Sequence, residues 1–570
     1  MADSADSTLS VLVFSALAIY TIRLFIAFRR NVRAVGNHPG YRTILFGNSF
    51  IANLLPRIPG VTQGRMTLWR LKHKGYQMDD PYFCYSFARQ VYMWPKSSFG
   101  FRMADAAAIK EVTSSRTRWT KAAQQYQLLR YFGDNILITE GDEWKRHRRT
   151  ANPAFSERNN RMVWNEAVRI VNDMFKNDWQ DRPEIVVENC VDITMRLALL
   201  VIGSAGFGRS ISWESDLQIP PGHHMSFKDA LHVVSTGLFW KLVIPEWAMC
   251  LTQKWRTINQ AFSELDEPEK ISERHDLFSN LLVASEEEAD GSKKLSDSDL
   301  RGNIFIFMLG GHETTAHTLC FCFGLLALYQ DEQDNLFQHI NSVLSDGRPP
   351  TYEDMGALTY SLAVLYETLR LFPPVIAIPK TCAEATTLAT STSSGERRVV
   401  AVPKGSLINL HIAGLHCNPK YWKDPLEFRP RRFLEDYNRD AFLPFSGGAR
   451  SCIGRRYIFE TESIAFLTKI IQNYKIEVKE EPQFAHETFA KRRERVLDCK
   501  YGITLSIKYT NLSVEYGASN GYIALKSFVQ FKNLNRLTPC NTQSFLAIEG
   551  EGIQPLNAIR HVKEWVVHRK

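Results

Sequence analysis

Residues 445–454 read FSGGARSCIG, and this stretch near the C-terminal end of the chain decides the fold. One cysteine, Cys452, stands among glycines that let a backbone turn closely around a bulky group. The fixed Phe, Gly, Arg, Cys and Gly recur at these spacings by chance on the order of once in ten thousand chains of this length. A buried structural cysteine in a glycine-rich turn is the ordinary alternative. The spacing favours a ligand role for Cys452.

The residues around Cys452 suit haem iron. A thiolate bound to haem iron donates electron density that favours O–O cleavage on the opposite face, and nearby backbone N–H groups tune the potential. Arg450 is placed to pair with a haem propionate, which a planar guanidinium can bind with two hydrogen bonds. The ten cysteines show no C-x-x-C pair. This spacing argues against a disulfide framework and against a zinc site.

Residues 445–454 fill every fixed position of F-x-x-G-x-R-x-C-x-G, the haem-binding signature of the cytochrome P450 superfamily. The chain resembles this family, in its eukaryotic microsomal form, over roughly residues 30–509. The resemblance implies the cytochrome P450 fold with haem b as cofactor. The residues that it assigns to haem binding are the iron ligand Cys452 and the neighbours Arg450, Phe445, Trp144, Arg148 and Lys380.

Three further residues match a structural motif of the same family. Glu367 and Arg370 fit its E-x-x-R helix, and Arg432 fits the arginine that completes a buried salt-bridged triad with them. The resemblance implies a structural lock that supports haem binding without taking part in the reaction. Lys380 stands where many members carry an arginine, so it supplies the positive charge without the two-pronged guanidinium.

A long apolar stretch at residues 300–328 is typical of a buried helix, and the preceding polar segment ends in Ser and Asp residues that can cap it. Its residues 310–315 read GGHETT, which weakens a helix. Thr314 lies four residues after Gly310, so its hydroxyl can bond that carbonyl, bend the helix and open a notch for a small ligand. A kink that merely packs well is the alternative.

The GGHETT stretch also matches the oxygen-activation motif of the resembled family. The resemblance implies that Thr314 and Glu313 deliver protons to iron-bound dioxygen. Cleaving dioxygen needs two protons carried through hydroxyl groups and water at a site otherwise kept dry, which agrees with these residue types. His312 occupies the variable position of the motif and is expected to be a hydrogen-bonded side chain, not an iron ligand.

The N-terminus predicts a membrane anchor. Residues 8–28 are apolar over about the 20 residues that a spanning helix needs, and Arg23 lies near one end, where it can snorkel. Positive charge follows the stretch, which favours a cytosolic catalytic domain and single-pass anchoring in the endoplasmic reticulum. A cleaved signal peptide is the alternative. The expected parts are a lumenal N-terminus (1–7), an anchor (8–28), a connector (29–60), a haem-thiolate catalytic domain (61–509) and an atypical tail without an assigned role (510–570).

Composition and periodicity predict a mainly α fold with small β-sheets, built as a single large domain behind the transmembrane helix. Hydrophobic residues make up 44% of the chain, which excludes disorder for most of it, and the net charge of +8 gives no sign of nucleic-acid binding. The predicted helices are 166–179, 191–202 and 300–328. Strand-like runs are few and late in the chain, and they cover residues 399–402, 406–411 and 502–507.

These features predict a monooxygenase that inserts one oxygen atom from dioxygen into a lipophilic substrate, in specialised metabolism such as terpenoid biosynthesis. The chain has no dinucleotide fingerprint, so NADPH-derived electrons must come from a separate flavin-containing cytochrome P450 reductase, with cytochrome b5 as a further candidate partner. One rival is a haem-thiolate isomerase or dehydratase, against which the Glu313–Thr314 pair argues. The other is a haem-binding protein without turnover.

Overall fold

The computed structural model describes most of the catalytic region and the N-terminal helix. The described residues are 2–34, 42–45, 58, 61, 82–89, 96–187, 189–207, 212–213, 219, 223–226, 229–230, 233–234, 237, 240–241, 244–266, 281, 294–391, 397–479, 482–501, 507–509, 529–533 and 565–567. The chain forms two compact units, and each is described by itself. Unit 1 comprises Met1–Gln125, Val375–Glu427 and Tyr437–Cys452, and unit 2 comprises Tyr126–Pro374, Phe428–Asp436 and Ile453–Lys570.

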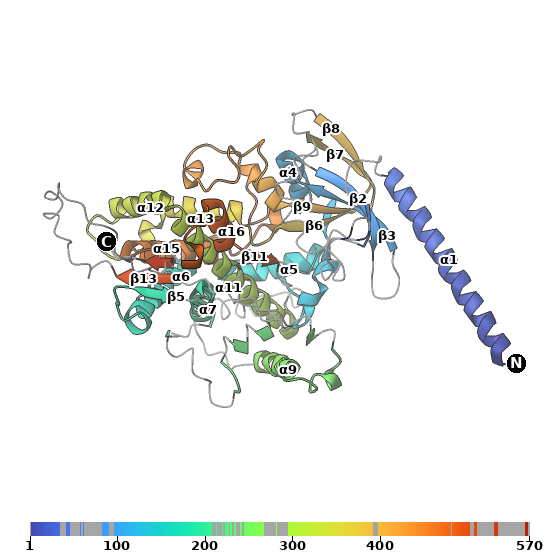
Figure 1. The fold of residues 1–570 in the computed structure, drawn as a ribbon, viewed down its shortest axis with the longest axis horizontal. Helices are drawn as coiled ribbons and strands as arrows, with labels where there is room; N and C mark the ends of the chain where they lie inside the picture. The colour runs from blue at the N-terminus through green and yellow to red at the C-terminus, as the bar shows by residue number, and fades with distance from the viewer. Residues whose placement is uncertain are drawn as a thin grey trace, which may run out of the picture. The chain divides into compact units, whose positions relative to one another are not determined.

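Unit 1 is built on a six-stranded sheet whose strands lie in the order β1-β2-β3-β9-β6-β4 (Figure 1). Its strands are β1 (Arg42–Leu45), β2 (Tyr82–Arg89), β3 (Lys96–Met103), β4 (Trp119–Lys121), β6 (Ala377–Cys382) and β9 (Leu407–His411), and the separate pair β7 (Thr386–Ser391) and β8 (Arg397–Val402). Its helices are α1 (Ala2–Ala34), α4 (Ala106–Ser114), α14 (Ile412–His416) and the short 3-10 turns η10 (Arg439–Ala441) and η11 (Gly448–Arg450).

Unit 2 holds most of the helices. They are α5 (Gly141–Ala151), α6 (Glu157–Asp173), α7 (Cys190–Phe207), α9 (Gln253–Asp266), α11 (Asp297–Leu328), α12 (Gln330–Val343), α13 (Thr359–Leu371), α15 (Thr461–Asn473) and α16 (Phe489–Val496), with the turns η9 (Pro430–Phe433) and η12 (Arg455–Glu460). Its strands are β5 (Ile185–Val187), β10 (Tyr474–Lys475), β11 (Cys499–Tyr501), β12 (Ile507–Tyr509), β13 (Val529–Asn533) and β14 (Trp565–Val567). The predicted mainly helical fold with small sheets is confirmed.

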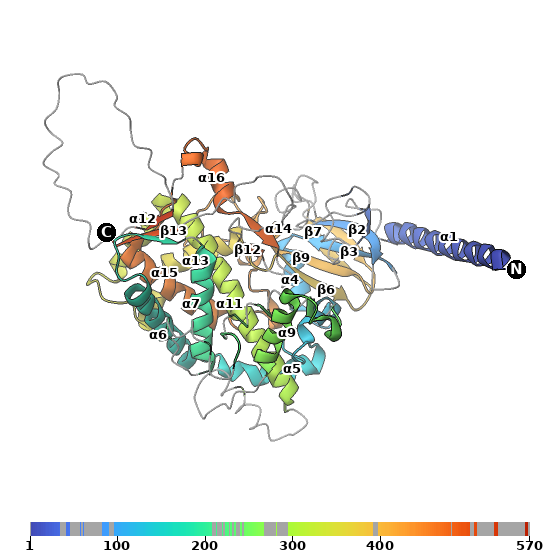
Figure 2. The same ribbon diagram turned by 60° about the horizontal axis from the view of Figure 1, so that its bottom comes forward.

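The 32-residue helix α11 runs through the core of unit 2 and packs beside α7 (Figure 2). Its N-terminus is held by a reciprocal cap, because the Ser296 hydroxyl accepts from the Asp299 N–H at 3.1 Å while the Asp299 carboxylate accepts from the Ser296 N–H at 3.1 Å. Almost every residue from Gly302 to Ala327 is buried. The predicted helix and its polar cap are therefore both observed.

The expectation that strands come late in the chain is wrong, because β1 to β4 all precede Ala122. Strand β3 is hard to recognise from sequence because its middle residue is Gly100, and glycine is depleted in strands. A Cβ at Gly100 would lie 2.8 Å from the Leu407 carbonyl oxygen of the neighbouring β9. The long-range pairing, not the local pattern, makes this strand. For the predicted strand 502–507, the structure has β11 and β12, and residues 502–506 lie outside the described residues.

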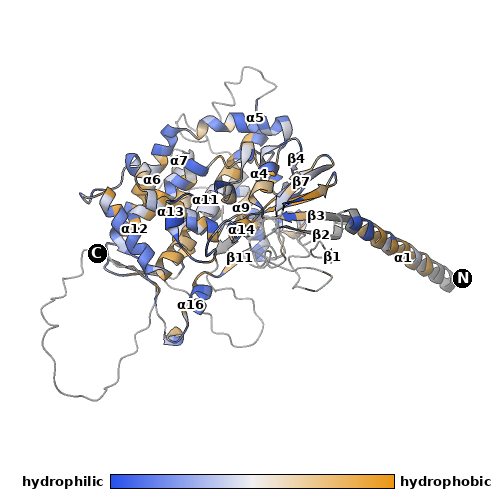
Figure 3. Ribbon diagram, turned by 90° about the horizontal axis from the view of Figure 1, so that it is seen from above, coloured by the Kyte–Doolittle hydropathy of each residue, from blue (hydrophilic) through white to orange (hydrophobic). Residues whose placement is uncertain are grey.

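Helix α1 is one continuous segment from Ala2 to Ala34, so it runs beyond both predicted ends of the apolar stretch 8–28. Residues Val11–Asn31 have a mean hydropathy of 2.2 and are long and apolar enough to cross a membrane (Figure 3). None of that span is buried. Its hydroxyl at Thr21 donates to the Leu17 carbonyl at 2.7 Å, so this polar group is satisfied within the helix.

Two short pieces of the tail past residue 509 belong to a sheet of unit 2. Strand β13 pairs antiparallel with β5 and with β10, and parallel with β14. Because β5 follows α6 and β10 follows α15, the tail strand joins segments far apart in the sequence. The rest of the tail lies outside the described residues.

The close approach of α11 to the segment before α5 gives a stability prediction. A Cβ at Gly302 would lie 2.4 Å from the Asp134 carbonyl oxygen, a backbone atom that cannot rotate away. We expect Gly302→Ala to lower the free energy of unfolding by about 1–3 kcal/mol in chemical denaturation.

Gly310→Ala on the same helix is the matched control, because a Cβ there meets nothing within 4 Å. It should leave the stability unchanged or raise it by up to about 1 kcal/mol, since alanine favours a helix over glycine. An equal loss in both variants would contradict the steric explanation.

Candidate functional site

The turn that carries Cys452 is closed by a backbone hydrogen bond within unit 1. The Cys452 N–H donates to the Phe445 carbonyl at 2.9 Å. Ser446 and Gly448 adopt left-handed backbone conformations, with φ of 60° and 66°. A Cβ at Gly448 would lie 2.2 Å from the Thr113 carbonyl oxygen of α4, so only glycine fits there. The glycines of the motif therefore let the turn fold tightly against α4.

The Cys452 side chain is exposed in this turn. The cysteines of the helices α7 and α11 and of the sheet region are buried instead, and these are Cys190, Cys320, Cys322, Cys382 and Cys417. Among the cysteines with described side chains, none takes part in a disulfide. An accessible sulfur in a narrow glycine turn, two residues after an arginine, is a donor set that fits haem iron and its propionates.

The other predicted haem-binding residues of unit 1 are partly or fully covered. Phe445, at the start of the turn, and Arg450, two residues before Cys452, are half-buried. Lys380 lies on β6, where its backbone register pairs it with Ile408 of β9 and with Lys121 of β4, and only 6% of it is exposed. Lys380 was selected from its position after the E-x-x-R helix, and the structure adds that this position is a buried one on β6.

Glu367, Arg370 and Arg432 form a contiguous ion-pair cluster in unit 2. Arg370 donates from Nε to Glu367 Oε2 at 2.7 Å and from Nη2 to Oε1 at 2.8 Å, and Arg432 donates from Nε to Oε1 at 3.1 Å. The backbone N–H of Arg429 donates to Oε1 at 2.9 Å and is the fourth hydrogen bond to the Glu367 carboxylate. Both side chains of the first pair are fully buried. The cluster ties α13 to the segment around η9.

Because this cluster is buried, the loss of one of its charges would cost much more free energy than the loss of a charge on the surface. Burial lowers the pKa of Arg432, with the neighbouring Arg370 and Arg429 charges acting in the same direction, while Glu367 opposes the shift. Removing the carboxylate would therefore leave two guanidinium groups in a low-dielectric region without their counter-charge, which is far more costly than losing a surface ion pair.

A second polar network of unit 2 was not found by sequence reasoning. The Tyr366 hydroxyl donates to Glu460 Oε1 at 2.5 Å, and Arg455 donates from Nε to the same oxygen at 2.9 Å and from Nη2 to the Tyr366 oxygen at 2.7 Å. Burial and the Glu460 charge both raise the pKa of Tyr366. Arg455 is the first and Glu460 the last residue of η12, which follows the cysteine motif directly in the sequence. The network therefore connects the end of that motif to the start of α15.

The oxygen-activation stretch lies in the middle of α11. The Thr314 hydroxyl donates to the Gly310 carbonyl at 2.7 Å, and the helix continues through this position to Leu328. Gly310 is exposed and Thr314 is partly exposed in an otherwise buried stretch, so this helix face borders open space. Glu313 is buried. His312 is also buried, and its Nδ1 lies 2.7 Å from the Met308 carbonyl oxygen, a hydrogen bond that makes it a satisfied side chain.

Trp144 and Arg148 lie one turn apart on α5 and therefore on the same face of that helix. Trp144 is buried and Arg148 is half-buried. Between them, His147 is buried completely and hydrogen-bonded to Asn303 of α11. Sequence reasoning selected neither His147 nor Asn303.

The predicted site residues are divided between the two units. In unit 2 the structure brings the triad of Glu367, Arg370 and Arg432 into contact, and the same unit holds Glu313, Thr314, Trp144 and Arg148. Cys452, Arg450, Phe445 and Lys380 belong to unit 1.

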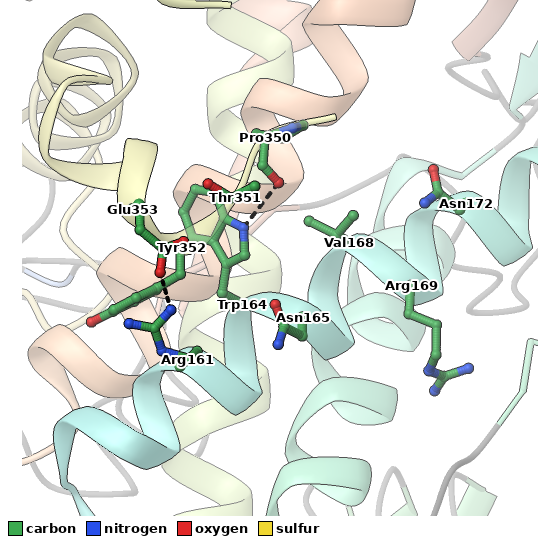
Figure 4. A pocket seen from close by; sticks show the side chains of 10 residues that line it. All are labelled: Arg161, Trp164, Asn165, Val168, Arg169, Asn172, Pro350, Thr351, Tyr352 and Glu353. Atoms are coloured by element: carbon green, nitrogen blue, oxygen red, sulfur yellow. Dashed lines mark hydrogen bonds and ion pairs between the residues drawn. The ribbon is translucent and has the colours of Figure 1, made fainter. Parts of the chain in front are cut away.

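A surface pocket of about 450 Å³ lies beside α6 in unit 2 (Figure 4). In its wall, the Trp164 indole N–H donates to the Pro350 carbonyl at 3.2 Å, and Arg161 forms an ion pair with Glu353. None of the predicted site residues lines this pocket. The pocket therefore carries no part of the predicted site.

The accessible thiol and the buried glutamate-arginine cluster agree with comparisons to known proteins. The sequence model of the family Cytochrome P450 matches residues 90–496. Cytochrome P450 monooxygenase 124 of Postia placenta is 50% identical over 511 residues, which cover 87% of this chain and 97% of that protein. The chain therefore belongs to the cytochrome P450 family, and it is an enzyme of the monooxygenase type.

More distant relatives show the same family. Cytochrome P450 monooxygenase ORF6 of Penicillium roqueforti is 29% identical over 426 residues, 65% of this chain and 73% of that protein. Cytochrome P450 4A14 of Rattus norvegicus is 29% identical over 410 residues, 68% of this chain and 78% of that protein. A fungal and a mammalian member thus each match about two thirds of this chain, and the family implies a haem cofactor.

The buried cluster gives a second stability prediction. We expect Glu367→Gln to lower the free energy of unfolding by about 3–5 kcal/mol, because the amide leaves the buried Arg370 and Arg432 charges uncompensated. Chemical denaturation followed by circular dichroism measures the change.

Glu353→Gln is the matched control, since Glu353 pairs with Arg161 on the exposed surface, where ion pairs contribute little. Its denaturation midpoint should match that of the unmodified chain. A Glu367→Gln midpoint that also matched would contradict the assigned structural importance of the cluster.

Proposed function

We propose that the enzyme inserts one oxygen atom from dioxygen into a C–H or C=C bond of a lipophilic substrate, with haem b as cofactor. The observation that carries this proposal is the exposed Cys452 thiol in a tight glycine turn, in a chain that belongs to the cytochrome P450 family. A thiolate is the ligand that gives haem iron the electron density needed to cleave dioxygen. Bound haem would supply this oxygen chemistry, and the chain supplies binding and protons.

Six residues are proposed to hold the cofactor. Cys452 would be the iron ligand, and Phe445 would lie beside its sulfur. Cationic or indole donors would bind the propionates, and these are Arg450, Lys380, Trp144 and Arg148. Charge-assisted hydrogen bonds from such donors to carboxylates are about twice as strong as neutral ones. The triad of Glu367, Arg370 and Arg432 would support this site as a structural lock.

Thr314 and Glu313 are proposed to carry protons. The Thr314 hydroxyl can donate elsewhere after releasing the Gly310 carbonyl, and it is partly exposed on the helix face that borders open space. Glu313 is the neighbouring carboxyl group and the source of the next proton. His312, whose Nδ1 is hydrogen-bonded to the Met308 carbonyl, does not compete for this role.

A lipophilic substrate and separate electron donors complete the proposal. The α11 residues Phe305, Met308 and Leu309 are apolar and buried, as expected of a site for an apolar compound. We propose a role in secondary metabolite biosynthesis, such as that of terpenoids. Electrons would come from NADPH through cytochrome P450 reductase, with cytochrome b5 as an alternative donor.

The domain organisation is proposed from α1. The helix exposes apolar side chains over a span long enough for a bilayer, and arginines follow its apolar part. We propose a single-pass anchor in the endoplasmic reticulum membrane at residues 8–28, with residues 1–7 in the lumen. The connector at 29–60 and the catalytic domain at 61–509 would then be cytosolic.

The iron ligand is tested by the spectrum of the reduced, CO-bound protein. Unmodified protein in microsomes should show a Soret band shifted far to the red, which reports thiolate ligation. Cys452→Ala should lose that band and all product formation from a panel of lipophilic metabolites supplied with a reductase. A product that persists in this variant would overturn the mechanism.

Proton delivery is tested at Thr314. We expect Thr314→Ala to reduce product formation on the order of 100-fold, the usual contribution of a positioned proton donor, while NADPH continues to be consumed and hydrogen peroxide is released. Thr314→Ser keeps the hydroxyl and should retain coupling of NADPH use to product. Equal coupling in the alanine and serine variants would exclude the hydroxyl from this role.

A further inference from the structure

Asn303 connects three segments of unit 2. Its Oδ1 accepts from the Ile136 N–H at 2.9 Å, and its Nδ2 donates to the Asp299 carbonyl one turn earlier on α11 at 2.7 Å. The same Nδ2 lies 2.7 Å from Nδ1 of His147 on α5. Asn303 and His147 are both fully buried. One amide therefore joins α11, α5 and the segment that leads into α5.

The two backbone partners fix the orientation of the Asn303 amide. The Ile136 N–H can only donate, so it must face the amide oxygen. The Asp299 carbonyl can only accept, so it must face the amide nitrogen. The second amide hydrogen then points at His147 Nδ1, which must accept. The bond consequently requires a neutral imidazole whose proton is on Nε2, and protonating Nδ1 would set one donor against another.

The surroundings of His147 favour this neutral form. Burial lowers the pKa of His147, and the charge of Arg146 on α5 acts in the same direction. Asp299 on α11 and Asp134 in the segment before α5 oppose the shift. Asp299 is itself paired with Arg146 at 3.3 Å. Among the described residues, no partner accepts from His147 Nε2.

We propose that Asn303 and His147 are a positioning pair that fixes α5 against α11 and thereby sets how Trp144 and Arg148 meet the haem propionate. This positioning role rests on the haem binding proposed above. Because His147 lies directly before Arg148 on the helix, a rotation of α5 that breaks the Asn303 bond also turns the Arg148 side chain away. The adjacent Gly302 approaches the same segment closely, because a Cβ there would lie 2.4 Å from the Asp134 carbonyl oxygen.

The pair makes haem retention depend on pH. The ordinary pKa of histidine is 6.5, and the pKa of His147 in the folded protein is lower. At pH values above 6.5 the neutral ring stabilises the fold, and this stabilisation is lost as the pH falls from 6.5 through the lowered pKa. The loss arises because protonation turns the acceptor of the Asn303 bond into a donor. Haem release should therefore accelerate as the pH is lowered from 7.5 to 5.5.

The test measures the rate of haem transfer from the full-length ferric protein to excess apomyoglobin at pH 7.5 and pH 5.5. Asn303→Leu removes the pair at similar volume and should speed transfer about tenfold or more at pH 7.5, as for other partners that orient a cofactor ligand. Asn159→Leu is the matched control, because Asn159 is an equally buried amide of unit 2 that binds the Ala154 carbonyl. It should stay close to the unmodified rate.

His147→Asn separates positioning from general stability. The asparagine Oδ1 stands where Nδ1 was and accepts at any pH, so the ratio of the rates at pH 5.5 and pH 7.5 should fall towards one. Any loss of packing by the smaller side chain changes the transfer rates at both pH values by the same factor, so it leaves the ratio of the two rates unchanged. This variant therefore tests the role of the Asn303–His147 bond even if Asn303→Leu does not fold.

Two results would overturn the positioning pair. One is an Asn303→Leu transfer rate equal to that of Asn159→Leu, and the other is a His147→Asn ratio equal to that of the unmodified protein. Failure of the proposed haem-thiolate function is seen separately, because the unmodified protein would then lack the red-shifted Soret band of the reduced CO complex.

Discussion

The Glu367 carboxylate is the interaction on which the architecture of unit 2 depends. It receives two hydrogen bonds from Arg370, one from Arg432 and one from the Arg429 backbone, all in a fully buried position. A buried charge that met fewer donors would cost several kcal/mol. The satisfied carboxylate therefore ties α13 to η9 in the arrangement that supplies all four donors.

The features that could be predicted from the sequence are those whose residues lie only a few positions apart in the chain. The cysteine turn, the E-x-x-R pair and the Thr314–Gly310 bond each lie within one motif, so the chain order brings their atoms near one another. The cap and length of α11 follow equally from local pattern. By contrast, β3 depends on the absence of a Cβ at Gly100, which pairs with Leu407 of β9, a strand far later in the chain.

The polar networks were missed for the same physical reason. Asn303 and His147 are 156 residues apart, and Tyr366 and Glu460 are 94 residues apart. Neither pair has a spacing or residue pattern that differs from an ordinary helix surface. Only packing shows that these side chains are buried, and burial is what makes their hydrogen bonds necessary. The one signal in the sequence was the polar residue Asn303 within the largely apolar stretch 300–328.

The uncovered apolar surface of α1 affects how a substrate would reach the enzyme. A bilayer that accepts this helix also dissolves lipophilic compounds, since both gain free energy by leaving water. A tethered enzyme would meet such compounds at their concentration in the lipid, which greatly exceeds that in the surrounding water. Diffusion in two dimensions, together with partitioning, would then govern supply, and detergent-solubilised protein would lose that advantage.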